Sequence, residues 1–322
     1  MSEATTNNPN PANSFRDEFL ALWRRFPDKR LFFGLLGLWL LLFLVLGNST
    51  FGYVDSPSLF RWMHNAYSYP NSEDSHGYLI PAVVLALFWW KREKLVAVPK
   101  GVWWPGLVFL GLSTALHIGG YLIQQPRVSI VAMFAGGYAL LALVWGWPFA
   151  KASFFPYVLF GFCVPLGGLL DPITVPLRQV STDLAVFASR NLLGIPILQD
   201  GVQIIDPQGH YAYEVAAACS GIRSLITFLA LTTIYGFVSF TTPWKRAVIV
   251  SLALPLALAG NVIRLLAIIV AAEAFGQKAG HFVHEWFGFV SFLMALAVLL
   301  GVGHWLREPL RTNVAGMTPR TA

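Results

Sequence analysis

The stretch AVIVSLALPLALAGNVIRLLAIIVAAEAF, residues 247–275, decides the fold. It is longer than the ~20 apolar residues with which an α-helix crosses the hydrocarbon core of a bilayer. Lys245 and Arg246 precede it, and basic residues at the end of an apolar run are typical of the cytoplasmic end of a membrane span. Asn261 and Arg264 interrupt the run, and polar side chains within a span face the protein interior. The stretch therefore predicts a membrane helix with a polar inner face.

The whole chain has the composition of an integral membrane protein. Of its 322 residues, 56% are hydrophobic and only 12% are charged, which excludes an ordinary soluble domain. The net charge of +6 does not indicate nucleic acid, because Lys and Arg lie in short clusters at the ends of apolar runs. Two cysteines exclude a disulfide framework, although one bridge between Cys163 and Cys219 is conceivable.

Eight apolar runs predict an all-α membrane protein of about eight spans with both termini in the cytoplasm. Basic clusters lie at the ends of the runs that this topology places inside. The expected spans are about 31–46, 77–90, 102–123, 128–147, 154–170, 220–240, 247–275 and 287–305. We expect a disordered, basic cytoplasmic tail at 1–30, a membrane-embedded domain at 31–306 and a second cytoplasmic tail at 307–322.

The segment between the fifth and sixth runs predicts structure outside the hydrocarbon core. In LRQVSTDLAVFASRNLLGIPI, residues 177–197, apolar side chains recur at helical spacing at Leu177, Val180, Leu184, Phe187 and Leu192. Charged residues lie between them, which indicates an amphipathic helix on or in the outer leaflet. The β-prone runs VQII and YAYEV flank the turn-rich DPQGH and predict a small β-hairpin.

Cys219 lies where this hairpin passes into the sixth apolar run. Ala216–Ala218 before it and Ser220 and Gly221 after it would let backbone and substrate approach closely. The first turn of a helix and Arg223, one turn further on, would both favour the thiolate, which is the nucleophilic form. A cysteine among alanines is also commonly just a small buried side chain. Cys219 alone therefore does not distinguish a catalytic thiolate from a packing residue.

Arg264 is expected near the outer boundary of the membrane. It lies 18 residues beyond Arg246, and at about 1.5 Å per residue this distance nearly spans the hydrocarbon core. Because an apolar run continues beyond it, we expect the guanidinium to lie against the protein interior rather than to reach the interface alone. Asn261 is one turn earlier on the same helix face and could hydrogen-bond to Arg264 or its partner.

Further polar groups belong to the same outer level. His281 and His284 precede the eighth run, and Asp74 and His76 precede the second. His284 could instead be an interfacial residue beside Trp286, and His76 could simply orient the second span. The segment HFVHE does not match the HExxH spacing of a zinc hydrolase, and we expect no metal site.

A thiol, an imidazole and a guanidinium at one membrane face are suited to cysteine-based acyl transfer. The thiolate would attack a peptide carbonyl, the imidazole would move protons, and the cation would stabilise the oxyanion. A transporter would place its charges near the bilayer midplane in broken, repeated helices, and the sequence shows neither feature. A thiol-disulfide enzyme would need a CxxC motif, which the sequence lacks.

Several segments carry a family resemblance. They are AACSGIR at 217–223, NVIR at 261–264, HEWFGFVSF at 284–292, DSHGYLIP at 74–81 and FCVPLGGLLDPIT at 162–174. Together they resemble the exosortase/archaeosortase family of membrane-embedded cysteine transpeptidases over roughly residues 50–305. Any one of the segments alone is a weak signal, but the CSGxR element with the later Arg and His is fairly specific.

The resemblance implies a thiol protease and transpeptidase that cleaves C-terminal sorting signals of exported proteins. Such a signal comprises a short motif such as Pro-Glu-Pro, a transmembrane helix and a basic cluster. On this chain the resemblance implies that Cys219 is the nucleophile, His284 the general acid/base, and Arg264 the stabiliser of the oxyanion or of a substrate carboxylate. The residues expected to bind substrate or support the site are Arg223, Asn261, Ser220, His76, Asp74 and His281.

The resemblance also implies location and partners. We expect a bacterial inner-membrane protein with its site facing the extracytoplasmic side, often in organisms that produce exopolysaccharide. Its partners would be membrane-anchored substrates and a lipid or glycan acceptor, with no nucleic acid and no cofactor. The alternative is a polytopic transporter or an envelope-polysaccharide assembly protein without peptidase activity. The recognition motif, the acceptor, the oligomeric state and the choice between His281 and His284 stay open at this point.

Overall fold

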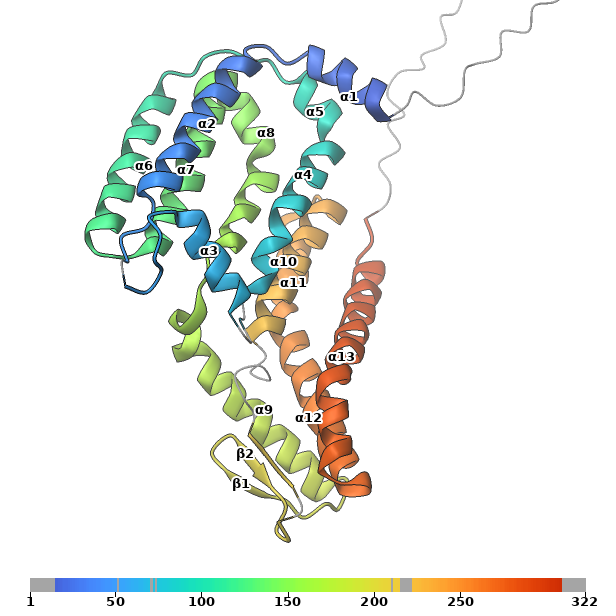
Figure 1. The fold of residues 1–322 in the computed structure, drawn as a ribbon. Coiled ribbons are helices and arrows are strands. Elements are labelled where there is room, and N and C mark those ends of the chain that lie inside the picture. Colours follow the sequence, from blue (N-terminus) through green and yellow to red (C-terminus); the bar gives the residue numbers. More distant parts are fainter. Residues whose placement is uncertain are drawn as a thin grey trace, which may run out of the picture. The chain divides into compact units, whose positions relative to one another are not determined.

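The computed structural model confirms an all-α membrane protein with one small sheet (Figure 1). It describes residues 15–308 except 51, 70, 71, 73, 210 and 215–221. At residues 213, 214, 222 and 223 it describes the backbone but not the side chain. The chain divides into two compact units, Met1–Leu166 and Gly167–Ala322.

The first unit is a bundle of helices around α7. Its elements are α1 (Phe15–Arg24), α2 (Lys29–Leu46), α3 (Leu59–Ser68), η1 (Ser75–Tyr78), α4 (Ile80–Trp90), α5 (Arg92–Ala97), α6 (Pro105–Leu122), α7 (Pro126–Trp145), α8 (Trp147–Val158) and η2 (Leu159–Cys163). Most residues of α7 are buried, and α2, α6 and α8 pack against it. Gly136 makes room for the ring of Trp39, whose indole Nε1 donates to the carbonyl oxygen of Met133 at 2.9 Å. Small residues at such contacts are typical of helix packing in membranes.

The second unit is built on α12. Its elements are η3 (Gly167–Leu170), α9 (Asp171–Asn191), β1 (Leu198–Asp200), β2 (Gln203–Ile205), β3 (Ala212–Glu214), α10 (Ile222–Ser239), α11 (Pro243–Ser251), α12 (Ala253–Phe275) and α13 (Gln277–Trp305). Helices α9, α10 and α13 all pack against α12. Gly276, with a φ of 83°, makes the sharp turn by which α13 returns along α12.

The sheet has three antiparallel strands in the order β1-β2-β3. The pairing of Ile204 with Tyr213 confirms the hairpin predicted from VQII and YAYEV. Strand β1 was not predicted, and its Gln199 pairs with Ile204 from the other side. Buried Ile197, Ile204 and Tyr211 pack into one apolar cluster with residues of α9 and α12, which anchors the sheet to these helices.

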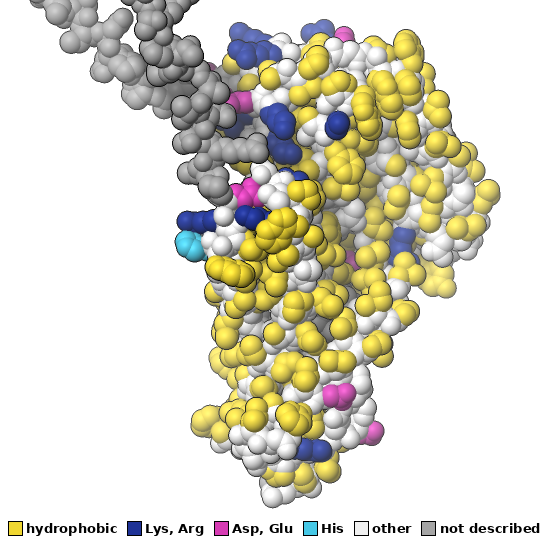
Figure 2. Space-filling model, turned by 180° about the vertical axis from the view of Figure 1, so that it is seen from behind, with side chains coloured by type: hydrophobic (Ala, Val, Ile, Leu, Met, Phe, Trp, Pro, Cys, Tyr) yellow, Lys and Arg dark blue, Asp and Glu magenta, His cyan; other side chains and the backbone are white. Residues whose placement is uncertain are grey.

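The structure confirms a multispanning protein but not the predicted count of eight spans. Among the described residues, five helical segments are long and apolar enough to cross a membrane: Lys29–Leu46, Pro105–Leu122, Pro126–Trp145, Pro243–Phe275 and Gln277–Trp305. The pair Trp147–Cys163 and Gly167–Asn191 makes a sixth if it is counted as one span. Figure 2 shows the matching surface, on which apolar side chains cover much of the visible face.

Two expected spans differ in detail from the prediction. The second is only the 11-residue helix α4. The fifth, expected at 154–170, is not one helix, since α8 ends at Val158 and a 3₁₀ turn follows it. Pro156 lies inside the last turn of α8, and a proline there removes a backbone donor and clashes with the preceding turn.

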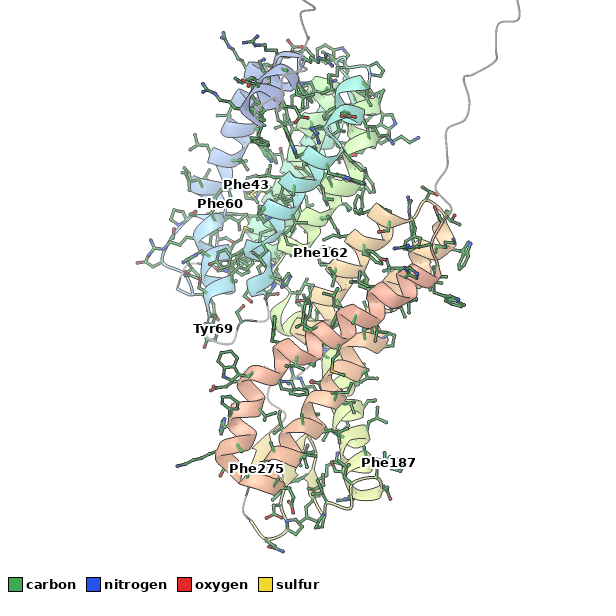
Figure 3. The ribbon with its side chains drawn as sticks, turned by 90° about the vertical axis from the view of Figure 1, so that its right-hand side faces the viewer. Phe43, Phe60, Tyr69, Phe162, Phe187 and Phe275 are labelled. Carbon is green, nitrogen blue, oxygen red and sulfur yellow. The ribbon has the colours of Figure 1, made fainter. Side chains whose placement is uncertain are left out.

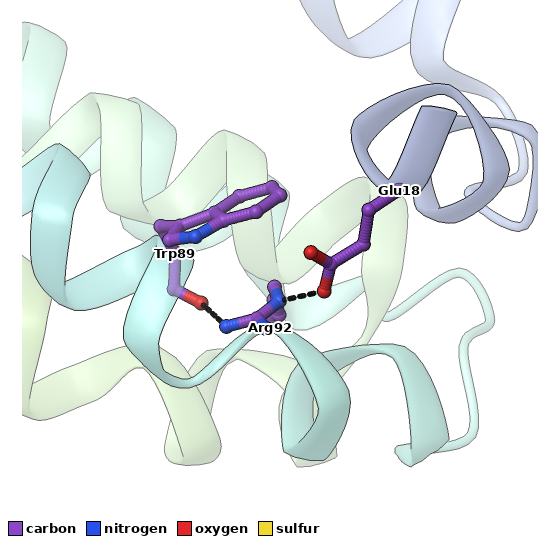
Figure 4. A network of polar contacts seen from close by, with 3 residues as sticks. All are labelled: Glu18, Trp89 and Arg92. Atoms are coloured by element: carbon purple, nitrogen blue, oxygen red, sulfur yellow. Dashed lines mark hydrogen bonds and ion pairs between the residues drawn. The ribbon is translucent and has the colours of Figure 1, made fainter. Parts of the chain in front are cut away.

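Part of the expected disordered tail is a helix. Helix α1 covers residues 15–24, and the rings of Phe15 and Phe19 lie 4.7 and 6.2 Å from that of Trp89. The carboxylate of Glu18 accepts from Arg92 Nε at 2.6 Å, and the Arg92 guanidinium lies 4.6 Å from the ring centre of Trp89 (Figure 4). These contacts hold an amphipathic helix against α4 and α5.

The predicted amphipathic helix is α9, and most of its predicted apolar stripe is exposed. Val180, Leu184 and Phe187 are 43%, 44% and 62% exposed, and Figure 3 shows Phe187 pointing away from α12. The buried residues of α9 are Thr174, Ser181, Thr182, Ala185, Val186 and Ser189. Apolar side chains outside and small or hydroxyl side chains inside are the pattern of a helix that contacts lipid.

Candidate active site

Two of the predicted site residues lie side by side on α12 and α13. Arg264 Nη2 donates to the backbone carbonyl oxygen of His284 at 2.7 Å. The guanidinium also faces Gly288, where an added Cβ would lie 3.5 Å from Arg264 Cζ. The bond through Nη2 fixes the guanidinium, while its buried Nε has no hydrogen-bond partner among the described residues. A fixed cation with a free donor can bind an anionic or carbonyl oxygen.

Both residues lie far from the basic end of their helices. Pro243–Phe275 has 33 residues and Gln277–Trp305 has 29, so each exceeds the bilayer thickness. Lys245 Nζ donates to the carbonyl oxygen of Leu306 at 2.9 Å, which holds the basic ends together. At about 1.5 Å per residue, Arg264 and His284 both lie about 30 Å from these ends, which is the thickness of the hydrocarbon core.

The two histidines of α13 differ in exposure. Their ring centres are 6.3 Å apart, and the rings are nearly perpendicular. His281 is exposed, whereas His284, one turn later, is half-buried next to Arg264. The exposed neighbour Glu285 lies on another part of the helix surface. Of the two imidazoles, His284 is therefore the one that shares its surroundings with the guanidinium.

Asn261 lies one turn before Arg264 and is buried. It is 5% exposed, and its Nδ2 has no hydrogen-bond partner among the described residues. Asn261 lines a cavity of about 10 Å³ together with Leu177 and Ser181 of α9. A buried amide N–H without an acceptor destabilises the fold unless a ligand or a water accepts its hydrogen bond. Asn261 is therefore suited to bind an oxygen acceptor.

Asp74 and His76 belong to the first unit. The carboxylate of Asp74, which is 6% exposed, accepts from the backbone N–H of Leu166 at 3.0 Å. His76 is half-buried within the 3₁₀ helix Ser75–Tyr78. Asp74 therefore fixes the end of the segment that follows η2, and this contact was not predicted from the sequence.

Three predicted residues cannot be compared with the structure. Cys219 and Ser220 lie outside the described residues, and so does the side chain of Arg223. The other thiol, Cys163, is free and buried, with its Sγ 3.8 Å from the carbonyl oxygen of Gly77. The conceivable bridge between Cys163 and Cys219 involves a residue outside the described part of the chain.

The structure also shows polar contacts that were not predicted from the sequence. His64 Nδ1 lies 2.6 Å from the hydroxyl of Tyr78, which also lies 2.6 Å from Ser68 Oγ. The four-residue spacing of His64 and Ser68 on α3 is the only sequence signal for this cluster. In the described part of the chain, no three His, Cys, Asp or Glu side chains gather closely enough to hold a metal ion.

These features first define a class: a multi-pass helical membrane protein in which an arginine of α12 bonds to the backbone of a histidine of α13. Residues 62–301 match the family described as transmembrane exosortase. Since the match covers most of the chain, the protein belongs to this family. It is therefore a membrane transpeptidase of the exosortase class, which acts on proteins with sorting signals. A comparison with curated proteins and one with solved structures gave no match.

The contact between Gly288 and Arg264 leads to a graded prediction. Gly288→Ala should keep activity within about twofold, because its Cβ would lie at an ordinary contact distance of 3.5 Å. Gly288→Leu should reduce processing of a signal-bearing substrate by at least about tenfold, because the longer side chain needs the space of the guanidinium. The measurement is the processed fraction, normalised to the amount of enzyme in the membrane. Full activity of Gly288→Leu would show that the position of the guanidinium is unimportant.

Proposed function

We propose that this protein cleaves the C-terminal sorting signals of exported, membrane-anchored proteins and transfers the cleaved proteins to an envelope acceptor. The observation that carries the proposal is the pairing of Arg264 with His284 across α12 and α13. Cys219 lies three residues before α10, and α10 packs against the same helix, α12. Family membership supports the same reaction class.

In the first half-reaction the Cys219 thiolate attacks the carbonyl carbon of the scissile peptide bond. A C–S bond forms, and the carbonyl π electrons become the oxyanion, which the free donors of Arg264 stabilise. When the intermediate collapses, the C–N bond breaks and the leaving amine takes a proton from the His284 imidazolium. The substrate is then held as a thioester on Cys219.

In the second half-reaction a nucleophile of the acceptor attacks the thioester. It gives its proton to the His284 imidazole, which is neutral after the first half-reaction. The new acyl bond forms, the C–S bond breaks, and the thiolate is regenerated. With water as the nucleophile, the same steps would release a free carboxylate.

We propose that the site opens on the extracytoplasmic side of the bacterial inner membrane. This orientation is supported by the basic residues Lys245, Arg246 and Arg307, which lie at the ends of α11 and α13 away from Arg264. A substrate anchored by its own membrane helix would reach such a site by diffusion in two dimensions. The anchor raises the effective concentration of the cleavage motif without a large docking surface.

The two histidines should differ strongly on substitution. His284→Ala should lower the processing rate by about 10²-fold or more, because it removes the proposed acid/base next to Arg264. His281→Ala should change the rate by no more than about threefold, because this side chain is exposed. Both rates are measured on one fluorescent or epitope-tagged substrate. If His281→Ala were the more damaging change, the acid/base role would belong to His281.

The proposed function is tested by co-expression of the enzyme with a protein that ends in the tripartite signal. Loss of the signal should depend on the enzyme and should be visible as a decrease in substrate mass. A substrate without the short motif but with the same membrane helix serves as the control. If no signal-bearing substrate is processed by well-expressed enzyme, the peptidase proposal fails and the non-peptidase alternative gains support.

A further inference from the structure

Arg178 of α9 is a half-buried cation that no described residue neutralises. Its Nε is buried and has no hydrogen-bond partner among the described residues. The only salt bridge in the described part of the chain joins Glu18 and Arg92, in the other unit. A guanidinium in such surroundings is expensive to maintain, and a charged residue of this kind in a membrane protein indicates a functional site.

Helix α9 runs alongside α12 in the same direction. Leu177 and Ser181 line a cavity together with Asn261, and one turn further along both helices Ala185 packs in one cluster with Leu265. Arg178 directly follows Leu177, so it lies at the level of α9 at which this helix lines the cavity next to Asn261. Arg264 is on the next turn of α12.

Several buried polar atoms on these two helices have no described partner. They are Thr174 Oγ1, Arg178 Nε, Ser189 Oγ, Asn261 Nδ2 and Arg264 Nε. Thr174 and Asn261 are 1% and 5% exposed, so their polar groups are withdrawn from solvent. The three nitrogens can only donate hydrogen bonds, so a ligand that satisfies them has to offer acceptors such as oxygen atoms.

We propose that Arg178 is a substrate-binding residue that, with Asn261, holds an oxygen of the peptide next to Arg264. This inference rests on the proposed function and adds a binding residue on α9 to it. The ligand group is a peptide oxygen, either a main-chain carbonyl or a side-chain carboxylate near the cleavage point. The apolar face of α9 then contacts lipid, while its polar face holds the peptide.

The test compares Arg178→Met with Arg190→Met. Arg190 is on the same helix, but its Nε and Nη2 already donate to the carbonyl oxygen of Ile197 at 2.8 and 2.6 Å. Arg178→Met should raise the KM for the substrate by at least about tenfold, which corresponds to the loss of a charge-assisted hydrogen bond. Its Tm in detergent should stay equal or rise, because the unpartnered donor is removed. Arg190→Met should show the reverse, with a lower Tm and an unchanged KM.

A lower Tm of Arg178→Met with an unchanged KM would overturn the inference, because it would show a structural role. If this variant does not accumulate, Arg178→Lys is measured instead, and an unchanged KM for that variant would also count against a bidentate guanidinium contact. If the wild-type enzyme itself were inactive, the proposed function would be refuted. This result differs from an active wild-type enzyme with an unchanged KM in Arg178→Met, which would refute only the inference about Arg178.

Substrate variants identify which oxygen is bound. For each acidic residue near the cleavage point, KM is measured with the carboxylate and with the corresponding amide, using wild-type enzyme and Arg178→Met. If Arg178 binds a carboxylate, the effect of Arg178→Met should largely disappear on one amide substrate. If it binds a main-chain carbonyl, the effect should be the same on all substrates.

Discussion

Cys219→Ala should abolish processing, with a loss of more than about 10³-fold. Without the thiol no covalent acyl-enzyme can form, and an alanine has no group that could replace it. The measurement is the fraction of a co-expressed signal-bearing substrate that is cleaved, with the amount of enzyme in the membrane determined in parallel. The variant should accumulate normally, because a small residue among alanines replaces another small residue.

Cys163→Ala is the matched control for this experiment. Cys163 is 1% exposed, and its Sγ makes a weak contact with the carbonyl oxygen of Gly77 at 3.8 Å. Its replacement should cost no more than about 1–2 kcal/mol of stability and leave activity within about twofold. Normal cleavage by Cys219→Ala, or an equal loss in both variants, would exclude Cys219 as the nucleophile.

Arg264→Ala should lower the processing rate by about 10²–10³-fold, which is the typical effect of removing an oxyanion donor. Arg264→Lys keeps the charge but cannot both bond to the His284 carbonyl and present a second fixed donor, so it should recover only a small part of the rate. Both rates are measured with one substrate at saturating concentration, where kcat rather than KM reports the loss.

The stability of the Arg264 variants distinguishes catalysis from folding. Arg264 has one hydrogen bond to the backbone of α13, and its Nε is buried without a described partner, so alanine should change the Tm only modestly. If Arg264→Ala is inactive only because it fails to accumulate, or if it retains activity within about threefold, the oxyanion role is wrong.

Much of the second unit could be predicted from sequence because its signals are local. The apolar run at 247–275 and the glycine at 276 define α12 and its turn into α13. The positions of Arg264 and His284 relative to the basic ends of these helices then predict a common level, and the structure brings the two residues into contact. The helical rise per residue and the membrane thickness are enough to predict that Arg264 and His284 lie at one level.

Other features depend on packing between distant segments. The apolar stripe of α9 predicted a helix on or in the outer leaflet, but only the structure shows that the opposite face, with small and hydroxyl side chains, packs against the protein. Strand β1 was missed because a run of three residues carries almost no periodic signal. In the sequence Arg178 is only one of the charged residues between the apolar positions of 177–197, and the structure alone shows that its Nε is buried without a described partner.

The central claim is a thioester between Cys219 and the substrate, and hydroxylamine tests it most directly. Hydroxylamine attacks thioesters, so processing in its presence should give a substrate whose new C-terminus carries a hydroxamate, as determined by mass spectrometry of the C-terminal peptide. The Cys219→Ala variant should give neither cleavage nor hydroxamate. A substrate that is cleaved at the same rate with a free carboxylate, whether or not hydroxylamine is present, would contradict the thioester mechanism.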